Sequence, residues 1–403
     1  MCPKYTIGIE CSANKLAIGI LDSKCRILSN VRRTFAAPAG EGFFPRCVAR
    51  HHRQHIAQLI KLALNESCIT LSQIGLICYT KGPGFGSCLY VGSVAAKVLH
   101  LLTSAPVVCV NHCVAHVEMG RFISQFSDPA VLYVSGGNTQ VLVFDRNRRV
   151  YSVIGETLDI AAGNVIDRVA RLLKLPNYPA PGLSIELLAQ KATIKHKLLP
   201  LPIALKGMDC ALNGIVSKLE LLISRHPNMA IKRFETVQNE ALKPLCDGNY
   251  TFVQDAKSRD FQDTCSVGTR SLTNDLEYVK LETQKDVDLN EFHAEDVCYS
   301  VQEILFAMLV EITERAMSFT NADSVLLVGG VGCNRRLQEM IGKMAECRGA
   351  KLCPMDERYC IDNGIMIGYT GLLEYQVTKK SAKLEEMTVS QRYRTDETII
   401  HWR

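Results

Sequence analysis

The segment Tyr5-Thr-Ile-Gly-Ile-Glu10 begins a regular alternation of apolar strand-like runs and helical patterns. Strand-like runs extend over Tyr5–Leu21 and Ile74–Tyr79, and helical patterns cover His51–Leu64 and Ser93–Leu102. Strands that alternate with helices are typical of a sheet whose faces are covered by helices. The N-terminal part of the chain is therefore predicted to form an α/β domain.

A second cycle of the same kind follows. A strand is expected at Ala130–Val134, a helix at Ile160–Leu173 and a further strand at Ser324–Val328. Two such cycles predict two α/β lobes with a cleft between them. We place the N-terminal lobe at residues 1–128 and the C-terminal lobe at residues 129–403.

Three segments depart from the alternation. Residues 224–293 mix polar residues with short apolar pieces and are interpreted as an insertion in the second lobe. The three prolines of 176–182 predict a rigid loop that could form a wall of the cleft. The polar tail after Tyr375 is interpreted either as a contact for RNA or a partner, or as a solvated tail.

Length and composition exclude several classes of protein. With 403 residues and 47% hydrophobic content, the chain can bury a large core. No apolar run reaches the roughly 20 residues needed to span a bilayer, and Met1 is followed almost directly by a strand, so we expect a cytoplasmic or nuclear protein without a membrane role. The 17 scattered cysteines suit reduced thiols, and the net charge of +5 permits nucleic-acid binding.

His112 and His116 are the first candidate functional residues. Side chains four residues apart on a helix project from one face, so both imidazoles could bind one metal ion. Cys113 stands where zinc peptidases of the HExxH type have their general base, which argues against peptide cleavage of that kind. Asp362 is either the N-cap of a following helix or the carboxylate that completes the site, which would suit Zn²⁺ or Fe²⁺.

Three glycine-rich turns each follow an apolar run, at Gly8–Lys15, Tyr133–Thr139 and Val328–Asn334. A glycine lets the main chain come close to an oxyanion, although each turn taken alone is more simply explained as a hairpin turn. Together they indicate a nucleotide cleft. The chain has neither a Walker motif nor a Rossmann fingerprint, so P-loop and dinucleotide-binding proteins are disfavoured.

Eight ordered motifs together resemble the Kae/TsaD family of tRNA threonylcarbamoyl transferases. They are Ile9–Lys15, Thr80–Gly84, Val110–His116, Tyr133–Gln140, Gly155–Asp159, Lys206–Asp209, Gly329–Arg336 and Cys360–Gly364. The resemblance implies a two-lobed actin-like and sugar-kinase (ASKHA) fold with a nucleotide cleft between the lobes. The Ser-Ala-Asn-Lys15 version of the first motif is similar to the archaeal and eukaryotic cytosolic branch, the catalytic subunit of the KEOPS complex.

The resemblance also implies a reaction and a set of roles. The threonylcarbamoyl group would pass from threonylcarbamoyl-AMP to N6 of adenosine 37 in ANN-decoding tRNAs. One Zn or Fe ion per subunit would be held by His112, His116 and Asp362, with Tyr133 as an additional ligand. The residues implied to contact the nucleotide, which could also be ATP, are Tyr133, Val134, Ser135, Gly136, Gly137, Asp167, Gly182, Glu186 and Asn334.

Glu10 ends the first strand and is the candidate for proton transfer or substrate positioning, with a structural role as the alternative. The chain departs from the family pattern at Cys11, where glycine is usual, and at Ala211–Asn213, where Ser-Phe-Ser is usual. The resemblance implies tRNA and KEOPS-type subunits as partners, including a small atypical kinase.

The cationic run Arg46–His55 could contact RNA phosphates or form a solvated helix face. Three other functions stay open at this point. The chain could be an actin-like ATPase or small-molecule kinase, which would have no use for the two histidines. It could also be a metalloprotease, or a non-catalytic assembly subunit.

Overall fold

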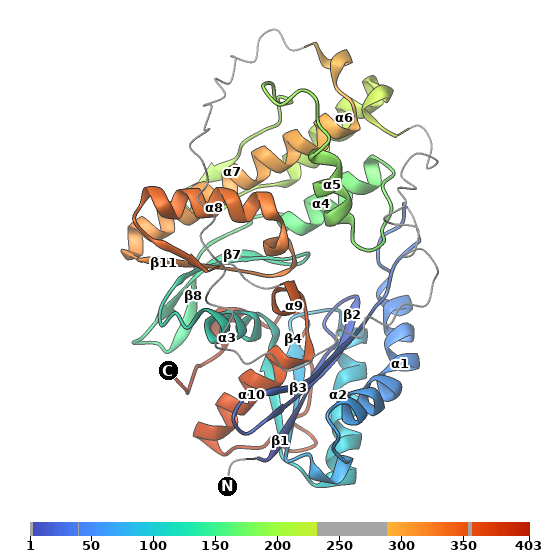
Figure 1. Ribbon diagram of the computed structural model, residues 1–403, viewed down its shortest axis with the longest axis vertical. Helices are drawn as coiled ribbons and strands as arrows, with labels where there is room; N and C mark the ends of the chain where they lie inside the picture. The colour runs from blue at the N-terminus through green and yellow to red at the C-terminus, as the bar shows by residue number, and fades with distance from the viewer. Residues whose placement is uncertain (1–2, 39, 232–287, 354–356) are drawn as a thin grey trace.

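The computed structural model describes residues 3–38, 40–231, 288–353 and 357–403 (Figure 1). Its strands form two five-stranded sheets and one two-stranded sheet. Strands and helices alternate along both halves of the chain, so the predicted α/β class is confirmed. The greater part of the predicted insertion, residues 232–287, lies outside the described residues.

The first sheet has the strand order β3-β2-β1-β4-β5. Its strands are β1 (Tyr5–Glu10), β2 (Lys15–Asp22), β3 (Ile27–Thr34), β4 (Leu76–Gly82) and β5 (Val107–Asn111). The first three strands form an antiparallel meander, whereas β4 and β5 run parallel to β1. The parallel strands β1, β4 and β5 therefore bring their carboxyl ends to one edge, where ligand sites of α/β proteins are usually found.

Helices cover both faces of this sheet (Figure 1). Helices α1 (Pro45–Glu66) and α2 (Gly86–Thr103) pack on one face, and α10 (Gly364–Thr378) packs on the other, against β1 and β2. Gly8 and Gly364 allow α10 to pack closely on the sheet. A Cβ built on Gly8 would lie only 2.1 Å from the Gly364 carbonyl oxygen, so a larger residue would not fit there. These glycines let α10 lie directly on the sheet, and they bring Asp362 toward the ends of the strands.

The second sheet has the strand order β12-β11-β6-β7-β8. Its strands are β6 (Ala130–Val134), β7 (Thr139–Asp145), β8 (Val150–Glu156), β11 (Ser324–Val328) and β12 (Lys351–Cys353). The helices of this half are α4 (Ala162–Leu172), α5 (Pro181–Ala189), α6 (Asn213–Arg225), α7 (Ala294–Thr320) and α8 (Arg335–Cys347). They share one apolar core with β6 and β11, to which α7 contributes many buried side chains.

The remaining elements are short connections between the two halves or within them. They are β9 (Leu205–Lys206), β10 (Asp209–Cys210), α9 (Glu357–Cys360) and the 3₁₀ turns at Leu71–Gln73, Pro227–Met229, Leu289–Glu291, Gly330–Cys333 and Thr395–Glu397. Helix α3 (His112–Ser124) contacts both α10 and β11 and so lies between the two sheets.

The structure refines the predicted organisation. The division at residue 128 stays a prediction, but α10 lies beyond that boundary and packs on the first sheet, so the chain returns to its first half. The proline-rich loop ends earlier than predicted, because Pro181 and Gly182 begin α5, where the fixed φ of proline suits the first turn.

The prediction of a solvated tail was wrong. The tail runs along both halves: Ser390 N donates to the Lys81 carbonyl at 2.8 Å, and Ile400 N donates to the Arg149 carbonyl at 2.7 Å. A Cβ on Gly82 would lie 1.8 Å from the Ser390 carbonyl oxygen, which shows how closely the tail follows β4. Backbone hydrogen bonds to two separate elements hold it in place.

Helix α2 is long and apolar enough to cross a membrane by length and composition alone, and 39% of its apolar window is buried. Its buried side packs on α1 and β4 as a core helix does. A single helix of this kind is weak evidence for a membrane role, and the absence of such a role stays a prediction.

Candidate functional site

Helix α3 starts where β5 ends, and this junction positions the two histidines. The Asn111 side chain caps the helix, because its Oδ1 accepts from Cys113 N at 2.9 Å and Val114 N at 3.2 Å. Asparagine is among the strongest N-cap residues, so the helix begins at His112 rather than a turn later. The rings of His112 and His116 lie edge to face with centroids 4.7 Å apart, on one side of the helix as predicted.

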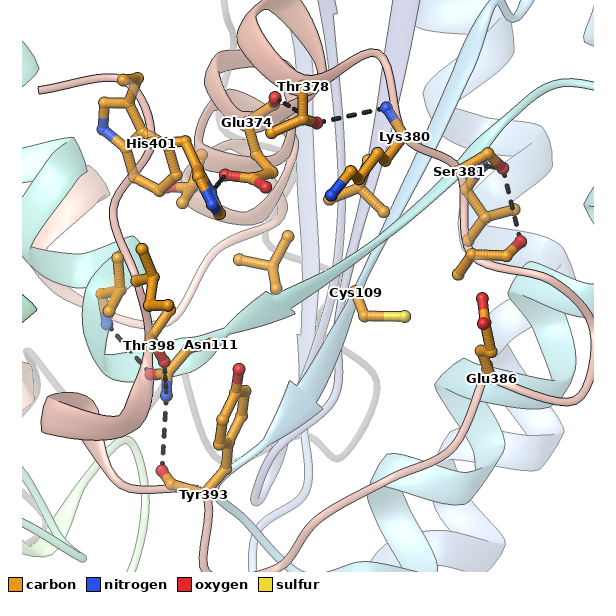
Figure 2. A pocket seen from close by; sticks show the side chains of 18 of the residues that line it. Cys109, Asn111, Glu374, Thr378, Lys380, Ser381, Glu386, Tyr393, Thr398 and His401 are labelled. Carbon is orange, nitrogen blue, oxygen red and sulfur yellow. Dashed lines mark hydrogen bonds and ion pairs between the residues drawn. The ribbon is translucent and has the colours of Figure 1, made fainter. Parts of the chain in front are cut away.

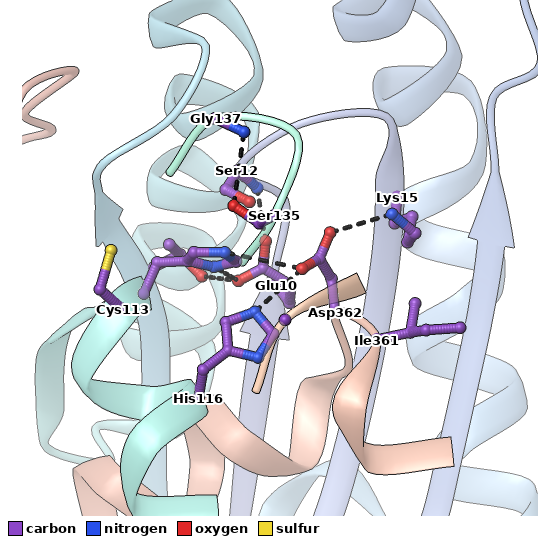
Figure 3. Close-up of polar contacts among 12 residues, drawn as sticks. Glu10, Ser12, Lys15, Cys113, His116, Ser135, Gly137, Ile361 and Asp362 are labelled. Carbon is purple, nitrogen blue, oxygen red and sulfur yellow. Dashed lines mark hydrogen bonds and ion pairs between the residues drawn. The ribbon is translucent and has the colours of Figure 1, made fainter. Parts of the chain in front are cut away.

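Asp362 completes a three-residue cluster with these histidines (Figure 3). Its Oδ1 lies 3.0 Å from His116 Nε2 and 3.6 Å from His112 Nε2. The three ligand atoms all lie within 4.8 Å of one another. The alternative interpretation of Asp362 as an N-cap was wrong, because Asn363 caps α10 through Oδ1, which accepts from Met366 N at 2.9 Å.

Glu10 contacts Nδ1 of His112, whereas Asp362 approaches Nε2 of that ring. Glu10 Oε2 is 3.0 Å from His112 Nδ1 and accepts from Thr80 Oγ1 at 2.6 Å, while Oε1 accepts from Ser12 N at 2.6 Å. The side chain is fully buried. This arrangement fixes the His112 tautomer and leaves Nε2 facing the cluster, which is how outer carboxylates orient metal-binding histidines. The geometry thus favours an orienting role for Glu10, and proton transfer by it stays a prediction.

Burial and neighbouring charges shift the pKa values of Glu10, His112 and Asp362 in opposite directions. Burial alone would raise the pKa of Asp362, but Lys15 and the two histidines outweigh it and hold that pKa well below its usual range. Burial is likewise outweighed at Glu10, whose pKa is lowered by His112, and at His112, whose pKa is raised by Glu10. At His116 burial prevails and the pKa is lowered. The site therefore holds two carboxylates in their ionised form.

The donor set fits a divalent metal ion. Two imidazole nitrogens and one carboxylate are ligands that zinc and iron accept, with positions left for other ligands. The Tyr133 hydroxyl is buried and has no hydrogen-bond partner among the described residues, and the Tyr133 ring centroid is 5.4 Å from that of His116. A buried unpartnered hydroxyl is costly, and a bound ion would satisfy it. Within the part of the chain that the structure describes, His116 Nδ1 also has no hydrogen-bond partner, so no carboxylate there orients this ring as Glu10 orients His112.

The predicted glycine turn after β6 lies beside the cluster (Figure 3). Ser135 organises it, since its Oγ accepts from Gly137 N at 3.3 Å and Asn138 N at 3.0 Å. The space around Gly136 and Gly137 is open, because a Cβ on either would meet nothing within 4 Å. A ligand can therefore approach the main chain at Gly136 and Gly137, although the amides of Gly137 and Asn138 already donate to Ser135 Oγ.

The other predicted nucleotide residues lie on helices of the second half. Asp167 is on α4, where burial raises its pKa to about 6 despite the nearby charges of Arg171 and Lys15. Gly182 is in the first turn of α5, and its nearest non-local atom, in Ile166, would lie 3.6 Å from an added Cβ. That distance leaves room for a side chain.

Glu186 and Asn334 both accept hydrogen bonds from backbone amides at the start of α8. Glu186 Oε1 accepts from Arg335 N at 3.0 Å, and Asn334 Oδ1 accepts from Arg336 N at 2.9 Å. The Asn334 amide also donates to Gln302 Oε1 at 3.0 Å. Both side chains thus have structural partners, and nucleotide contacts by these residues and by Asp167 and Gly182 stay predictions.

Lys15 is a site residue that was not predicted. Its Nζ lies 3.2 Å from Asp362 Oδ2, the oxygen turned away from the histidines. Arg32 approaches the same residue, because its Nη1 donates to the Asp362 carbonyl oxygen at 3.3 Å. The Ser-Ala-Asn-Lys15 motif was noted as a family marker, but its spacing from Asp362 in the sequence gave no sign of this contact.

The cationic run on α1 divides into two sides. Arg46, Arg50 and Arg53 are exposed, as an RNA contact or a solvated face would require. The histidines turn inward: His52 Nε2 is 2.8 Å from the Ala13 carbonyl oxygen, and burial lowers the pKa of His52 to about 4. His52 is therefore not available to RNA, and the three arginines remain candidates for the predicted contact.

Comparisons with known proteins agree with the motifs. The family model described as tRNA N6-adenosine threonylcarbamoyltransferase (TsaD) matches residues 26–369. A protein with the name tRNA N6-adenosine threonylcarbamoyltransferase from Emericella nidulans is 44% identical, over 98% of this chain and 99% of its own length. Its counterpart from Gibberella zeae is 45% identical over 98% and 96%. A Drosophila melanogaster protein named as a probable enzyme of this kind is 44% identical, over 98% of each chain.

The fold has a solved counterpart. The crystal structure of HypF from T. kodakarensis superposes with a TM-score of 0.52 at 13% identity, and the match covers 96% of this chain and 50% of that one. At this identity the likeness concerns the fold alone. The predicted two-lobed α/β fold of the actin-like and sugar-kinase type is confirmed.

Proposed function

The chain belongs to the TsaD family, and from that premise we propose how its buried cluster serves the reaction. It is a tRNA N6-adenosine threonylcarbamoyltransferase and acts in the synthesis of N6-threonylcarbamoyladenosine in tRNA. We propose that the donor is threonylcarbamoyl-AMP and that the acceptor is N6 of adenosine 37 in ANN-decoding tRNAs. The donor is a mixed anhydride and brings its own activation, so the protein has to position both substrates and stabilise developing charge.

The observation that carries this proposal is the convergence of His112, His116 and Asp362 beside an open glycine turn. These three residues, with the unpartnered Tyr133 hydroxyl, would hold one divalent ion, either Zn or Fe. When bound, such an ion supplies a Lewis acid and an anchor for anionic oxygens of the donor. Glu10 keeps the His112 ring in place, and Lys15 holds the second oxygen of Asp362.

The glycine turn would bind the nucleotide part of the donor. The space beside Gly136 and Gly137 is open, so a phosphate group could come close to the main chain there without a Cβ in the way. Asp167 would accept hydrogen bonds from a ribose hydroxyl or a base. The acceptor adenosine must leave its stack in the anticodon loop to reach this site.

Mass spectrometry of nucleosides tests the proposal. An unmodified ANN-decoding tRNA is incubated with threonylcarbamoyl-AMP and the protein, with and without the expected partner subunits. His116→Ala is expected to abolish threonylcarbamoyladenosine formation, whereas the matched control His196→Ala, an exposed histidine, is expected to leave it unchanged. Equal product from both variants would contradict the role of the cluster.

The alternative functions are not favoured. A metalloprotease would need a general base beside the first histidine, but Cys113 is 1% exposed and its Sγ lies 3.6 Å from Asn138 Nδ2. The likeness to kinases and ATPases concerns the fold alone. Neither activity accounts for family membership over nearly the whole chain.

Partners and location are further parts of the proposal. tRNA is the substrate of the named activity. We propose that KEOPS-type subunits, including a small atypical kinase, assemble with this chain in the cytoplasm or nucleus. The exposed arginines of α1 supply positive charge for tRNA phosphates. Copurification of the chain with such subunits from its native source would test this assembly.

A further inference from the structure

Arg32, on β3, is a cation beside the metal cluster that pairs with no carboxylate among the described residues. Its Nη1 donates to the Asp362 carbonyl oxygen at 3.3 Å, and this is the one hydrogen bond of the guanidinium within the described ranges. Burial lowers the pKa of Arg32, and the nearby charge of Asp362 does not offset that effect. A guanidinium has five N–H donors and keeps its proton in proteins. Arg32 therefore has most of its donors free for a ligand.

The strand pattern directs Arg32 toward the cluster. The next residue, Arg33, points to the opposite face of the sheet, where its Nη1 lies 2.7 Å from His55 Nδ1 on α1. Successive side chains of a strand alternate between faces, so Arg32 lies on the face that α10 covers. Lys15 approaches Asp362 on this same face, from the neighbouring strand β2.

The charges around the cluster favour an anionic ligand. Lys15 Nζ is 3.2 Å from Asp362 Oδ2, whereas Arg32 contacts only a main-chain oxygen of that residue. The two carboxylates, Glu10 and Asp362, balance these two cations, so a bound divalent ion would leave an excess of positive charge. Charges away from bulk water need partners. The proposed donor brings two anionic groups, a phosphate and the free carboxylate of its threonine part.

The two anionic groups of the donor have different places to bind. The glycine turn lies beside α3, where Asn138 Nδ2 is 3.6 Å from Cys113 Sγ. Helix α3 follows β5, and β5 and β3 are the two edge strands of the first sheet. Arg32 thus reaches the cluster from the side opposite to the turn. With the phosphate at the turn, the carboxylate is left for Arg32, whose planar fork matches two carboxylate oxygens.

We propose that Arg32 binds the free carboxylate of the amino-acid part of the donor and so selects an amino-acid carbamate as the group to be transferred. This inference rests on the proposed function, because it concerns the donor of that reaction. A donor with a plain carbamoyl group has no carboxylate and would leave the guanidinium without its partner. Such a loss of a charged partner weakens binding strongly.

Cations also line a cavity of about 590 Å³ beside β5 (Figure 2). Lys380 and Lys383 lie along it, whereas Arg32, His112 and Asp362 do not. An anion bound in that cavity would be away from the metal cluster. Lys380 therefore serves as a control cation for the experiment that follows.

Steady-state transfer assays, measured by mass spectrometry of nucleosides, test the role of Arg32. Arg32→Gln is expected to raise the KM for threonylcarbamoyl-AMP at least about tenfold, because a charged hydrogen-bond pair is lost. Inhibition by AMP should stay unchanged, since AMP has no carboxylate, and metal content should equal that of the wild type. Arg33→Gln, on the opposite face, and Lys380→Gln are the matched controls and should behave as the wild type.

A donor analogue with a carboxamide in place of the carboxylate supplies a double-mutant cycle. The wild type should lose at least about tenfold in kcat/KM with this analogue. Arg32→Gln has already lost the contact and should lose little more. Arg32→Lys keeps the charge without the planar fork, so its values should fall between those of the wild type and Arg32→Gln. If Arg32→Gln does not fold, Arg32→Lys takes its place in the same assays.

Equal KM values for threonylcarbamoyl-AMP in the wild type and Arg32→Gln would overturn the inference. AMP inhibition that weakens as much as donor binding would also overturn it, because Arg32 would then bind the phosphate. A change confined to the KM for tRNA would overturn it as well, since the contact would then be to RNA. Failure of the proposed function is a different result, in which the wild type itself forms no threonylcarbamoyladenosine.

Discussion

Glu10 Oε2 lies 3.0 Å from His112 Nδ1, while Asp362 Oδ1 lies 3.6 Å from Nε2 of the same ring. The Glu10 carboxylate is fully buried and also receives hydrogen bonds from Thr80 and Ser12. A charge buried in this way needs all of its partners. Through the contact between Glu10 and His112, the first strand supports the metal cluster, although Glu10 is not one of the three candidate ligands.

Replacing Glu10 by Gln should weaken metal binding by about 10- to 100-fold, the usual effect of losing an outer carboxylate. The amide keeps the size of the side chain but loses the charge that orients His112. Competition with a chelator of known affinity measures the change. Glu385→Gln, at an exposed position, is the control, and equal affinity of both variants would show that Glu10 has no orienting role.

Replacing Lys15 by Met should shift metal binding to higher pH. Burial raises the pKa of Asp362, and Lys15 is the largest influence that lowers it. Its loss therefore raises that pKa, so protons compete with the metal at a higher pH. Metal titrations at acidic pH should show that Lys15→Met loses the metal at a higher pH than the wild type. Lys15→Arg should lose it at the same pH as the wild type. Loss of the metal at the same pH in Lys15→Met and the wild type would contradict this role of Lys15.

Nucleotide affinity should depend on the ionisation of Asp167. Burial raises the pKa of this carboxyl to about 6, so it is ionised only above that pH. If the carboxylate accepts a hydrogen bond from the nucleotide, affinity for AMP should fall up to about tenfold per pH unit below 6. Asp167→Asn should bind more weakly at neutral pH and lose this pH dependence. A wild-type profile that is flat between pH 5 and 7 would contradict the prediction.

The same shift has a consequence for folding stability. Because the folded-state pKa lies above the ordinary value of 3.8, the folded protein binds this proton more tightly than the unfolded chain. The Asp167 contribution to stability should therefore increase as the pH falls through 6 toward 4. Denaturant unfolding of the wild type and of Asp167→Asn across this range would reveal it as a pH-dependent difference.

Gly364→Ala should destabilise the protein severely. An added Cβ would lie 2.0 Å from the Gly19 backbone nitrogen, so α10 would have to move away from β2. Overpacking of a core costs about 1–3 kcal/mol, and a backbone clash belongs at or above the upper end of that range. Gly342→Ala is the control, since its Cβ would make an ordinary contact of 3.5 Å on α8 and should be neutral or stabilising. Thermal unfolding of both variants checks the prediction.

Much of the fold could be predicted from local pattern. The strands at Ala130–Val134 and Ser324–Val328 have the predicted bounds, because apolar runs of that length seldom fit anything but a buried strand. The path of the C-terminal tail could not be predicted in the same way. Its polar residues resemble a solvated segment, and its attachment depends on backbone groups that a sequence pattern does not display.

The candidate site was predicted unevenly for a similar reason. His112 and His116 are one helical turn apart, so their proximity follows from helix geometry. Asp362 lies 246 residues from His116 in the sequence, and from the residues alone an N-cap was an equal alternative. Only the packing of α10 on glycines of β1 and β2 brings it to the histidines, together with its contact to Lys15.

The central claim is that His112, His116 and Asp362 hold the metal ion on which threonylcarbamoyl transfer depends. The most direct measurement pairs the metal content of purified protein with its yield of threonylcarbamoyladenosine, for the wild type, His116→Ala, Asp362→Ala and His196→Ala. We predict that metal and product are lost together in the two cluster variants and kept in His196→Ala. Full product from a cluster variant that holds no metal would contradict the account.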